Sequence, residues 1–202
     1  MSLGKKSVLM IILILVVDQV LKIWVKTHMS IGQEIHLFGN WGILHFIENN
    51  GMAFGMEMGG QTGKLILSVF RIIAIIAIGY FLSSLINRRA YTGLVIAVSA
   101  IMAGAIGNII DSAFYGIIFS ESFNNPAILF PSEGAYSSFL LGKVVDMFYF
   151  PIINTHWPDW SPIKPGQSFV FFRPVFNIAD SAITCGVLSI VIFQKRMFRD
   201  FS

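Results

Sequence analysis

Apolar residues dominate four stretches of the chain, at about residues 7–26, 64–86, 91–118 and 177–194, and polar segments separate them. Each stretch is near the roughly 20 residues that an α-helix needs to cross a bilayer. The first stretch is longer than the apolar core of a signal peptide, and no small-residue cleavage site follows it. The pattern therefore predicts four transmembrane helices, with the first one retained.

Composition supports a membrane protein. Hydrophobic residues make up 55% of the 202 positions and charged residues only 12%, whereas a soluble domain carries about 25% charged residues. The formal net charge is +3, and no basic stripe is interleaved with aromatic residues. We therefore expect no nucleic-acid partner.

The basic residues predict the orientation of these helices. They form three clusters outside the apolar stretches: Lys5 and Lys6; Arg88 and Arg89; and Lys195, Arg196 and Arg199. With four spans, all three clusters and both termini lie on one side, which the positive-inside rule identifies as the cytoplasm. Residues of about 27–63 and 119–176 are then outer segments, and the second contains all seven prolines. We expect this second segment to be irregular or short-stranded.

Polar side chains within the apolar stretches are the candidate functional residues, because ionisable groups are costly in a membrane. Three groups share helix faces: Asp18 with Lys22; Gly104, Asn108 and Asp111; and Asn177 with Asp180. With the predicted orientation, each group lies in the outer half of its span. Asp180, for example, is roughly 22 Å along a helix from Lys195. The sequence therefore predicts a polar site near the outer boundary, although Asp18 and Lys22 fit a structural ion pair equally well.

Two other charged residues have simpler explanations. Arg71 lies about two turns inside the second stretch, where its side chain can extend to the interface. Glu48 precedes Asn49, Asn50 and Gly51, a composition that suits a turn at least as well as a catalytic loop.

Five polar segments occur in a characteristic order. They are Asp18–Lys22 (DQVLK), Asn49–Phe54 (NNGMAF), Gly104–Asp111 (GAIGNIID), Gly142–Asp146 (GKVVD) and Phe176–Ser181 (FNIADS). Each is weak alone. Together, on a frame of four spans, they resemble bacterial prolipoprotein signal peptidase, the signal peptidase II family, over the whole chain except the long outer segment.

The resemblance implies an α-helical polytopic membrane protein with four transmembrane helices, a small outer-face β-cradle from residues 27–63 and an irregular outer insertion. It implies one membrane-embedded aspartyl endopeptidase domain over residues 1–202 that cuts diacylglyceryl-modified prolipoproteins before the lipidated cysteine. The site would lie near the periplasmic face of the bacterial inner membrane, in contact with membrane lipids. We expect a monomer without cofactor or metal.

The resemblance also assigns roles to individual residues. The catalytic aspartates would be Asp146 and Asp180. The residues that bind substrate or support the site would be Asp18, Lys22, Asn49, Gly51, Gly104, Asn108, Asp111 and Asn177.

The chain departs from the family pattern in two respects. Ser112 stands where the family usually has an arginine directly after the aspartate, and Arg173 is one possible substitute. Long insertions also separate Gly116 from Gly142 and Asp146 from Asn177. They could form a lid or a surface for a partner.

Two neighbouring carboxyl groups suffice for peptide hydrolysis because they retain one shared proton, so that one acts as base and the other as acid. The four histidines lack the spacing of a zinc site, and there is no Gly-x-Ser-x-Gly elbow. The alternative is a small ion-coupled transporter or channel that uses Asp18, Asp111 and Asp180 as a relay. Such a relay should spread its carboxylates through the membrane depth.

Overall fold

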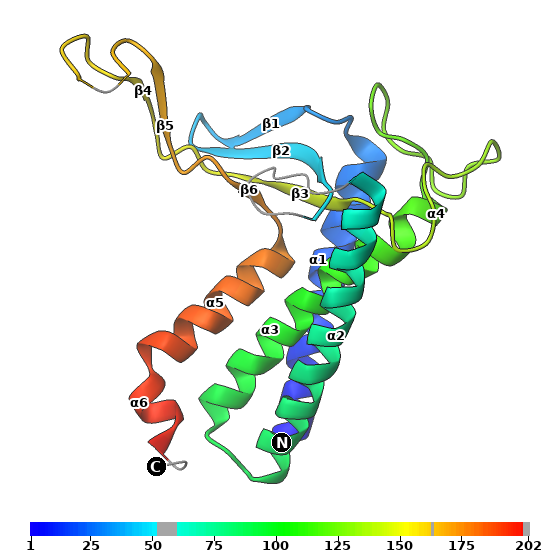
Figure 1. Ribbon diagram of the computed structural model, residues 1–202, viewed down its shortest axis with the longest axis vertical. Helices are drawn as coiled ribbons and strands as arrows, with labels where there is room; N and C mark the ends of the chain where they lie inside the picture. The colour runs from blue at the N-terminus through cyan, green and yellow to red at the C-terminus, as the bar shows by residue number, and fades with distance from the viewer. Residues whose placement is uncertain (52–59, 163, 200–202) are drawn as a thin grey trace.

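The computed structural model describes residues 1–51, 60–162 and 164–199 (Figure 1). Within this part of the chain, three helical segments are long and apolar enough to cross a membrane. They are α1 (Leu3–His28), α2 (Gly60–Asn87) and α3 (Thr92–Ile110), which continues through the π-helix η2 (Asp111–Tyr115) into α4 (Gly116–Ile118). The shorter apolar helix α5 (Ile178–Ile192) follows, and then α6 (Gln194–Met197). The chain is a helical polytopic membrane protein.

Helix α3 lies at the centre of the bundle and packs against α1, α2 and α5. Glycines allow α3 and α5 to approach closely. A Cβ atom on Gly104 would lie 2.2 Å from the carbonyl oxygen of Ala179, and one on Gly186 would lie 2.7 Å from that of Ala97. Small residues at such crossings let helix backbones pack without intervening side chains, as is common inside membranes.

An antiparallel sheet of four strands lies across the end of the bundle that is opposite both termini (Figure 1). Its strands are β1 (Glu34–Phe38), β2 (Gly42–Asn49), β3 (Val144–Tyr149) and β6 (Val175–Phe176), in that order. Phe46, Val145 and Met147 are fully buried and pack with Val25 and Tyr115 of the helices. This apolar core fixes the sheet on the helix ends.

The long outer segment, expected to be irregular or short-stranded, supplies two of the four strands of this sheet, β3 and β6. Asp146 lies within the short strand β3 and is paired in register with Ile47 of β2. Its neighbours Val145 and Met147 alternate into the core. This alternation requires an extended strand, although prolines and insertions surround it.

The two insertions have different structures. The first insertion, residues 119–143, is irregular, and it is attached to the end of the third span by hydrogen bonds from Ser137 to Gly116 and from Gly142 to Ser112. Part of the second forms a separate two-stranded hairpin, β4 (Ile153–His156) with β5 (Ser168–Phe171). The hairpin projects away from the bundle (Figure 1).

Candidate active site

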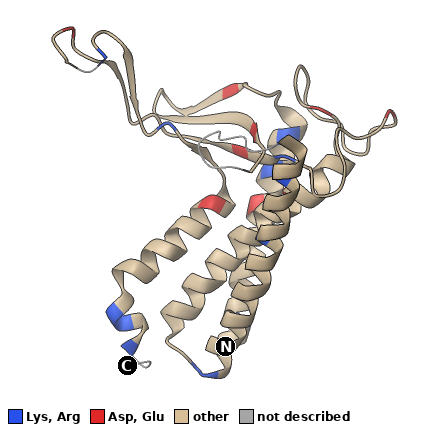
Figure 2. Ribbon diagram, in the orientation of Figure 1, with Lys and Arg blue, Asp and Glu red and all other residues tan. Residues whose placement is uncertain are grey.

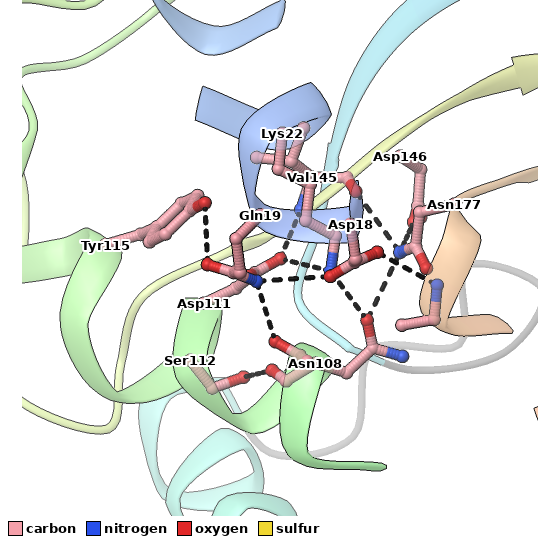
Figure 3. Close-up of polar contacts among 12 residues, drawn as sticks. Asp18, Gln19, Lys22, Asn108, Asp111, Ser112, Tyr115, Val145, Asp146 and Asn177 are labelled. Atoms are coloured by element: carbon pink, nitrogen blue, oxygen red, sulfur yellow. Dashed lines mark hydrogen bonds and ion pairs between the residues drawn. The ribbon is translucent and has the colours of Figure 1, made fainter. Parts of the chain in front are cut away.

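The buried ammonium group of Lys22 organises a polar cluster among α1, α3, β3 and α5 (Figure 3). Its Nζ lies 2.9 Å from a carboxylate oxygen of Asp18 and 2.9 Å from one of Asp111, and these three side chains are fully buried. Lys22 also donates to the Oδ1 of Asn108 at 3.0 Å. One cation thus joins residues from two spans. Asp18 and Lys22 therefore form an ion pair that also belongs to the polar cluster.

Asp111 connects this ion cluster to the sheet. Its Oδ2 accepts the backbone N–H of Val145 at 3.2 Å, and Val145 directly precedes Asp146. Ser112, which stands at the family's arginine position, donates back to the Asn108 carbonyl within its own helix. Lys22 is the counter-ion of Asp111. The suggestion that Arg173 substitutes is wrong, because Arg173 is exposed and makes no ion pair with any residue in the described ranges.

Asp146 is held by two amide side chains. The Nδ2 of Asn177 donates to its Oδ1 at 2.7 Å, and the Nδ2 of Asn49 donates to its Oδ2 at 3.2 Å. The residue is only 2% exposed. Burial, together with the negative charge of Asp180, raises the pKa of Asp146 to about 7. This carboxyl group can therefore hold a proton at neutral pH.

Asp180 is fixed by the start of α5. Asn177 is the N-cap, and its side-chain oxygen accepts the backbone N–H of Asp180 at 2.9 Å. In return, the Oδ2 of Asp180 accepts the backbone N–H of Asn177 at 3.3 Å, which completes a capping box. The other oxygen, Oδ1, accepts from Asn108 at 2.8 Å.

The two asparagines bridge the two aspartates. Asn177 touches Asp146 and Asp180, Asn108 touches Asp180, and the Nδ2 of Asn177 donates to the Oδ1 of Asn108 at 3.2 Å. Because amides are neutral, they orient the carboxyl groups without supplying a counter-charge. The arrangement therefore joins both carboxyl groups in one hydrogen-bonded network.

Two residues hold α5 against the rest of the site. The Oδ1 of Asp18 accepts the backbone N–H of Ala179 at 2.9 Å, so a carboxylate lies at the positive end of this helix. Gly104 lies against the same turn of α5. Its contribution is the absence of a side chain against the Ala179 carbonyl.

Gly51 and Arg71 form a contact beside the site. Gly51 has φ of +89°, and its N–H donates to the side chain of Asn49 at 2.8 Å. Arg71 donates to the carbonyl of Gly51. The Arg71 side chain therefore extends from within α2 to the outer segment that follows β2. Met52–Phe54, the rest of this expected motif, lie outside the described residues.

Several contributors were not expected from the sequence. Gln19 donates to both Asp18 and Asp111, and the hydroxyl of Tyr115 donates to Gln19 at 3.1 Å. The sequence feature that could have identified Gln19 is its polar side chain within an otherwise apolar span. Glu48, whose neighbours suited a turn at least as well as a catalytic loop, instead lies in β2, and its buried side chain pairs with Lys26 and Lys143.

No metal-binding arrangement of three or more His, Cys, Asp or Glu side chains occurs among the residues that the structure describes.

Two lipoprotein signal peptidases are similar to this chain over most of its length. The lipoprotein signal peptidase of Porphyromonas gingivalis (strain ATCC 33277) is 50% identical over 194 residues, which cover 96% of this chain and 84% of that protein. The lipoprotein signal peptidase of Amoebophilus asiaticus (strain 5a2) is 40% identical over 188 residues, which cover 92% of this chain and 75% of that protein.

Two solved structures of bacterial membrane enzymes have a similar fold. One is 27% identical with a TM-score of 0.58, and the similarity covers 93% of this chain and 91% of that one. The other, at 24% identity, has a TM-score of 0.60 and covers 95% of this chain and 88% of that one. The family model described as signal peptidase (SPase) II matches residues 10–196. The chain therefore belongs to the signal peptidase II family.

Proposed function

We propose that Asp146 and Asp180 are the catalytic pair with which this membrane peptidase removes signal peptides from prolipoproteins. The observation that carries the proposal is the bridge of Asn108 and Asn177 between the two carboxyl groups. Burial of Asp146 beside the charge of Asp180 raises the pKa of Asp146 to about 7, so this carboxyl group can hold a proton at neutral pH.

The pair supplies both proton transfers of hydrolysis. The ionised carboxylate takes a proton from a water molecule as that water attacks the scissile carbonyl, while the protonated carboxyl polarises the carbonyl oxygen. When the C–N bond breaks, the leaving amine receives a proton from the pair.

The surrounding residues position this pair. Lys22, Asp18 and Asp111 hold α1, α3 and α5 together by ion pairs and by the Ala179 hydrogen bond. Asn49, Asn108 and Asn177 orient the carboxyl groups. Gly51 shapes the turn after Asn49, and Gly104 lets α5 approach α3. We assign the catalytic step to the two aspartates alone.

The proposed substrate is a diacylglyceryl-modified prolipoprotein, cut before its lipidated cysteine. Its acyl chains would remain among membrane lipids while the peptide reaches the pair from the side. The rival transporter requires carboxylates spread along the membrane depth. Asp18, Asp111 and Asp180 instead belong to one connected cluster.

We propose that the chain crosses the bacterial inner membrane four times, with α5 as the fourth span. Both termini then lie in the cytoplasm. Helix α5 has 15 residues, or about 22 Å of rise, and α6 extends it in the direction of the basic C-terminal residues. Figure 2 shows basic residues at both ends of the bundle, whereas the acidic residues drawn lie only toward the sheet and the outer segments. The end with the termini therefore carries the excess of positive charge, which supports the orientation. The sheet is then the outer β-cradle, and the site faces the periplasm. We propose a monomer.

A gel-shift assay on a lipidated prolipoprotein tests the catalytic assignment with purified enzyme. Asp146→Asn and Asp180→Asn should each abolish cleavage while the protein remains folded and inserted. Asp159→Asn makes the same chemical change at an exposed position in the turn of the β4–β5 hairpin and should cleave normally. Full activity of either dyad variant would contradict the assignment. Reporter fusions after Gly60 and after Pro165 test the topology, and both should report an exterior location.

A further inference from the structure

A cavity of about 280 Å³ lies between the first turn of α2 and the first insertion, residues 119–143. Gln61 and Lys64 line it from the helix, and Tyr136 and Lys143 line it from the insertion. Neither catalytic aspartate lines this cavity. It is therefore separate from the site described above.

Lys64 is a buried cation whose contacts within the described part of the chain are neutral. The residue is only 8% exposed, and its Nζ donates to the side-chain oxygen of Asn50 at 3.2 Å. Among the described residues, no carboxylate lies within 4.0 Å of this ammonium group. A buried charge that meets only a neutral amide is costly. An anion in the cavity would remove that cost.

The surroundings of Lys64 are positively charged overall. Lys143 and Arg71 both repel it electrostatically, while Glu48 attracts it. Glu48, however, is shared between Lys26 and Lys143. Among the described residues that line the cavity, Glu121 is the acidic one, and these residues together leave a positive excess. A singly charged anion matches this balance.

The position of the cavity along α2 indicates which kind of anion would bind there. Lys64 is one turn inside a helix of 28 apolar-rich residues, at the level where phospholipid phosphates meet the hydrocarbon core. Leu65 next to it is 43% exposed, and Phe139 on the insertion is 55% exposed. A ligand at this place would find cations for its head and apolar side chains for its tails.

We propose that this cavity binds the phosphate of an anionic phospholipid headgroup between Lys64 and Lys143. The carboxylate of Glu121 accepts hydrogen bonds from hydroxyl groups of the head, which favours phosphatidylglycerol. Phosphatidylethanolamine binds more weakly because its own ammonium group leaves the positive excess uncompensated. Diacylglycerol, which has no phosphate, does not occupy the cavity.

Native mass spectrometry of the delipidated full chain in detergent tests this site, with phosphatidylglycerol, phosphatidylethanolamine and diacylglycerol titrated separately. The wild type should retain one phosphatidylglycerol in preference to the other two lipids. Lys64→Gln and Lys143→Gln should each weaken that binding about tenfold. Lys164→Gln removes the same charge from an exposed position in the second insertion and should bind as the wild type does.

Three results would overturn the proposal. The first is equal phosphatidylglycerol binding by the wild type and by both lysine variants. The second is equally tight binding of water-soluble glycerophosphoglycerol, which would make the cavity a site for free phosphate esters. The third is lipid binding that is unchanged in the lysine variants, together with a higher KM of these variants only for substrates with acidic residues after the cleavage site. Lipid binding is measured without hydrolysis, so its failure leaves the catalytic assignment untouched. The half-exposed Lys143 provides a variant that folds even if Lys64→Gln does not.

Discussion

Replacing Asp146 by asparagine should make the protein more stable at alkaline pH while it removes activity. Asparagine has the shape of the aspartate side chain but never carries its charge. The wild-type carboxyl group is buried, and its pKa is raised to about 7 by that burial and by the charge of Asp180. Ionisation of this group therefore works against the folded state.

The size of the effect follows from the pKa difference between the folded and unfolded states. An aspartate in an unfolded chain has a pKa of about 3.9, and a tenfold change in proton affinity corresponds to about 1.4 kcal/mol. The raised pKa of Asp146 in the folded protein, about 7, therefore corresponds to about 4 kcal/mol at most. Because the folded state binds this proton more tightly, its stabilising effect is present below about pH 4 and is lost as the pH rises through about 7. Against this gain, the substitution costs about 1 kcal/mol of stability, because asparagine makes one of the hydrogen bonds of the aspartate imperfectly.

Thermal unfolding in detergent at pH 5 and at pH 8 measures this difference. The midpoint of Asp146→Asn should exceed that of the wild type by about 5–10 °C at pH 8, and the advantage should shrink at pH 5. Asp159→Asn, at an exposed position, should show no such dependence on pH. A variant that is less stable than the wild type by the same amount at both values would refute the reasoning, since hydrogen bonding would then outweigh charge.

Three further predictions concern the same site. Gly104→Ala should lower the free energy of unfolding by about 1–3 kcal/mol and reduce cleavage, because the new Cβ would lie 2.2 Å from the Ala179 carbonyl oxygen. Gly4→Ala is the control, because its new Cβ would come no closer than 3.8 Å to a neighbouring atom, the Cγ2 of Ile86. Lys22→Met should destabilise by about 3–5 kcal/mol because it leaves the buried carboxylates of Asp18 and Asp111 unpaired, and an unchanged thermal midpoint would contradict the central role of this cation. The rate of hydrolysis should fall as the pH rises, with an apparent pKa near 7, because Asp146 then loses its proton. A rate that stays constant to pH 9 would argue against a proton held at this site.

Much of the helical frame was predictable because the signals are local. A spacing of four places Asp18 and Lys22 on one face, and the pair Asn177 and Asp180 has the spacing of a capping box. The expectation that these groups lie together with Asn108 required only a rough estimate of depth along each span. The structure brings them into contact.

The contribution of the sheet was harder to predict. Asp146 lies on a six-residue strand whose partner is almost a hundred positions earlier in the chain, and no local pattern encodes such pairing. The partner of Asp111 also depended on tertiary contact, since Lys22 reaches it from another helix. Glu48 was misjudged because its neighbours favour a turn, whereas burial against Lys26 and Lys143 keeps it in β2.

The hydrogen bond from Ala179 to Asp18 joins positions 161 residues apart, and this separation has a consequence for biosynthesis. The first helix enters the membrane long before α5 has been made, since synthesis proceeds from the N-terminus. During that interval, Asp18 and Lys22 can neutralise each other within a single helix, because they are four residues apart. The pair that we propose as catalytic is complete only when the last helix arrives. On that proposal, the unfinished chain cannot act as a peptidase until nearly all of it has left the ribosome.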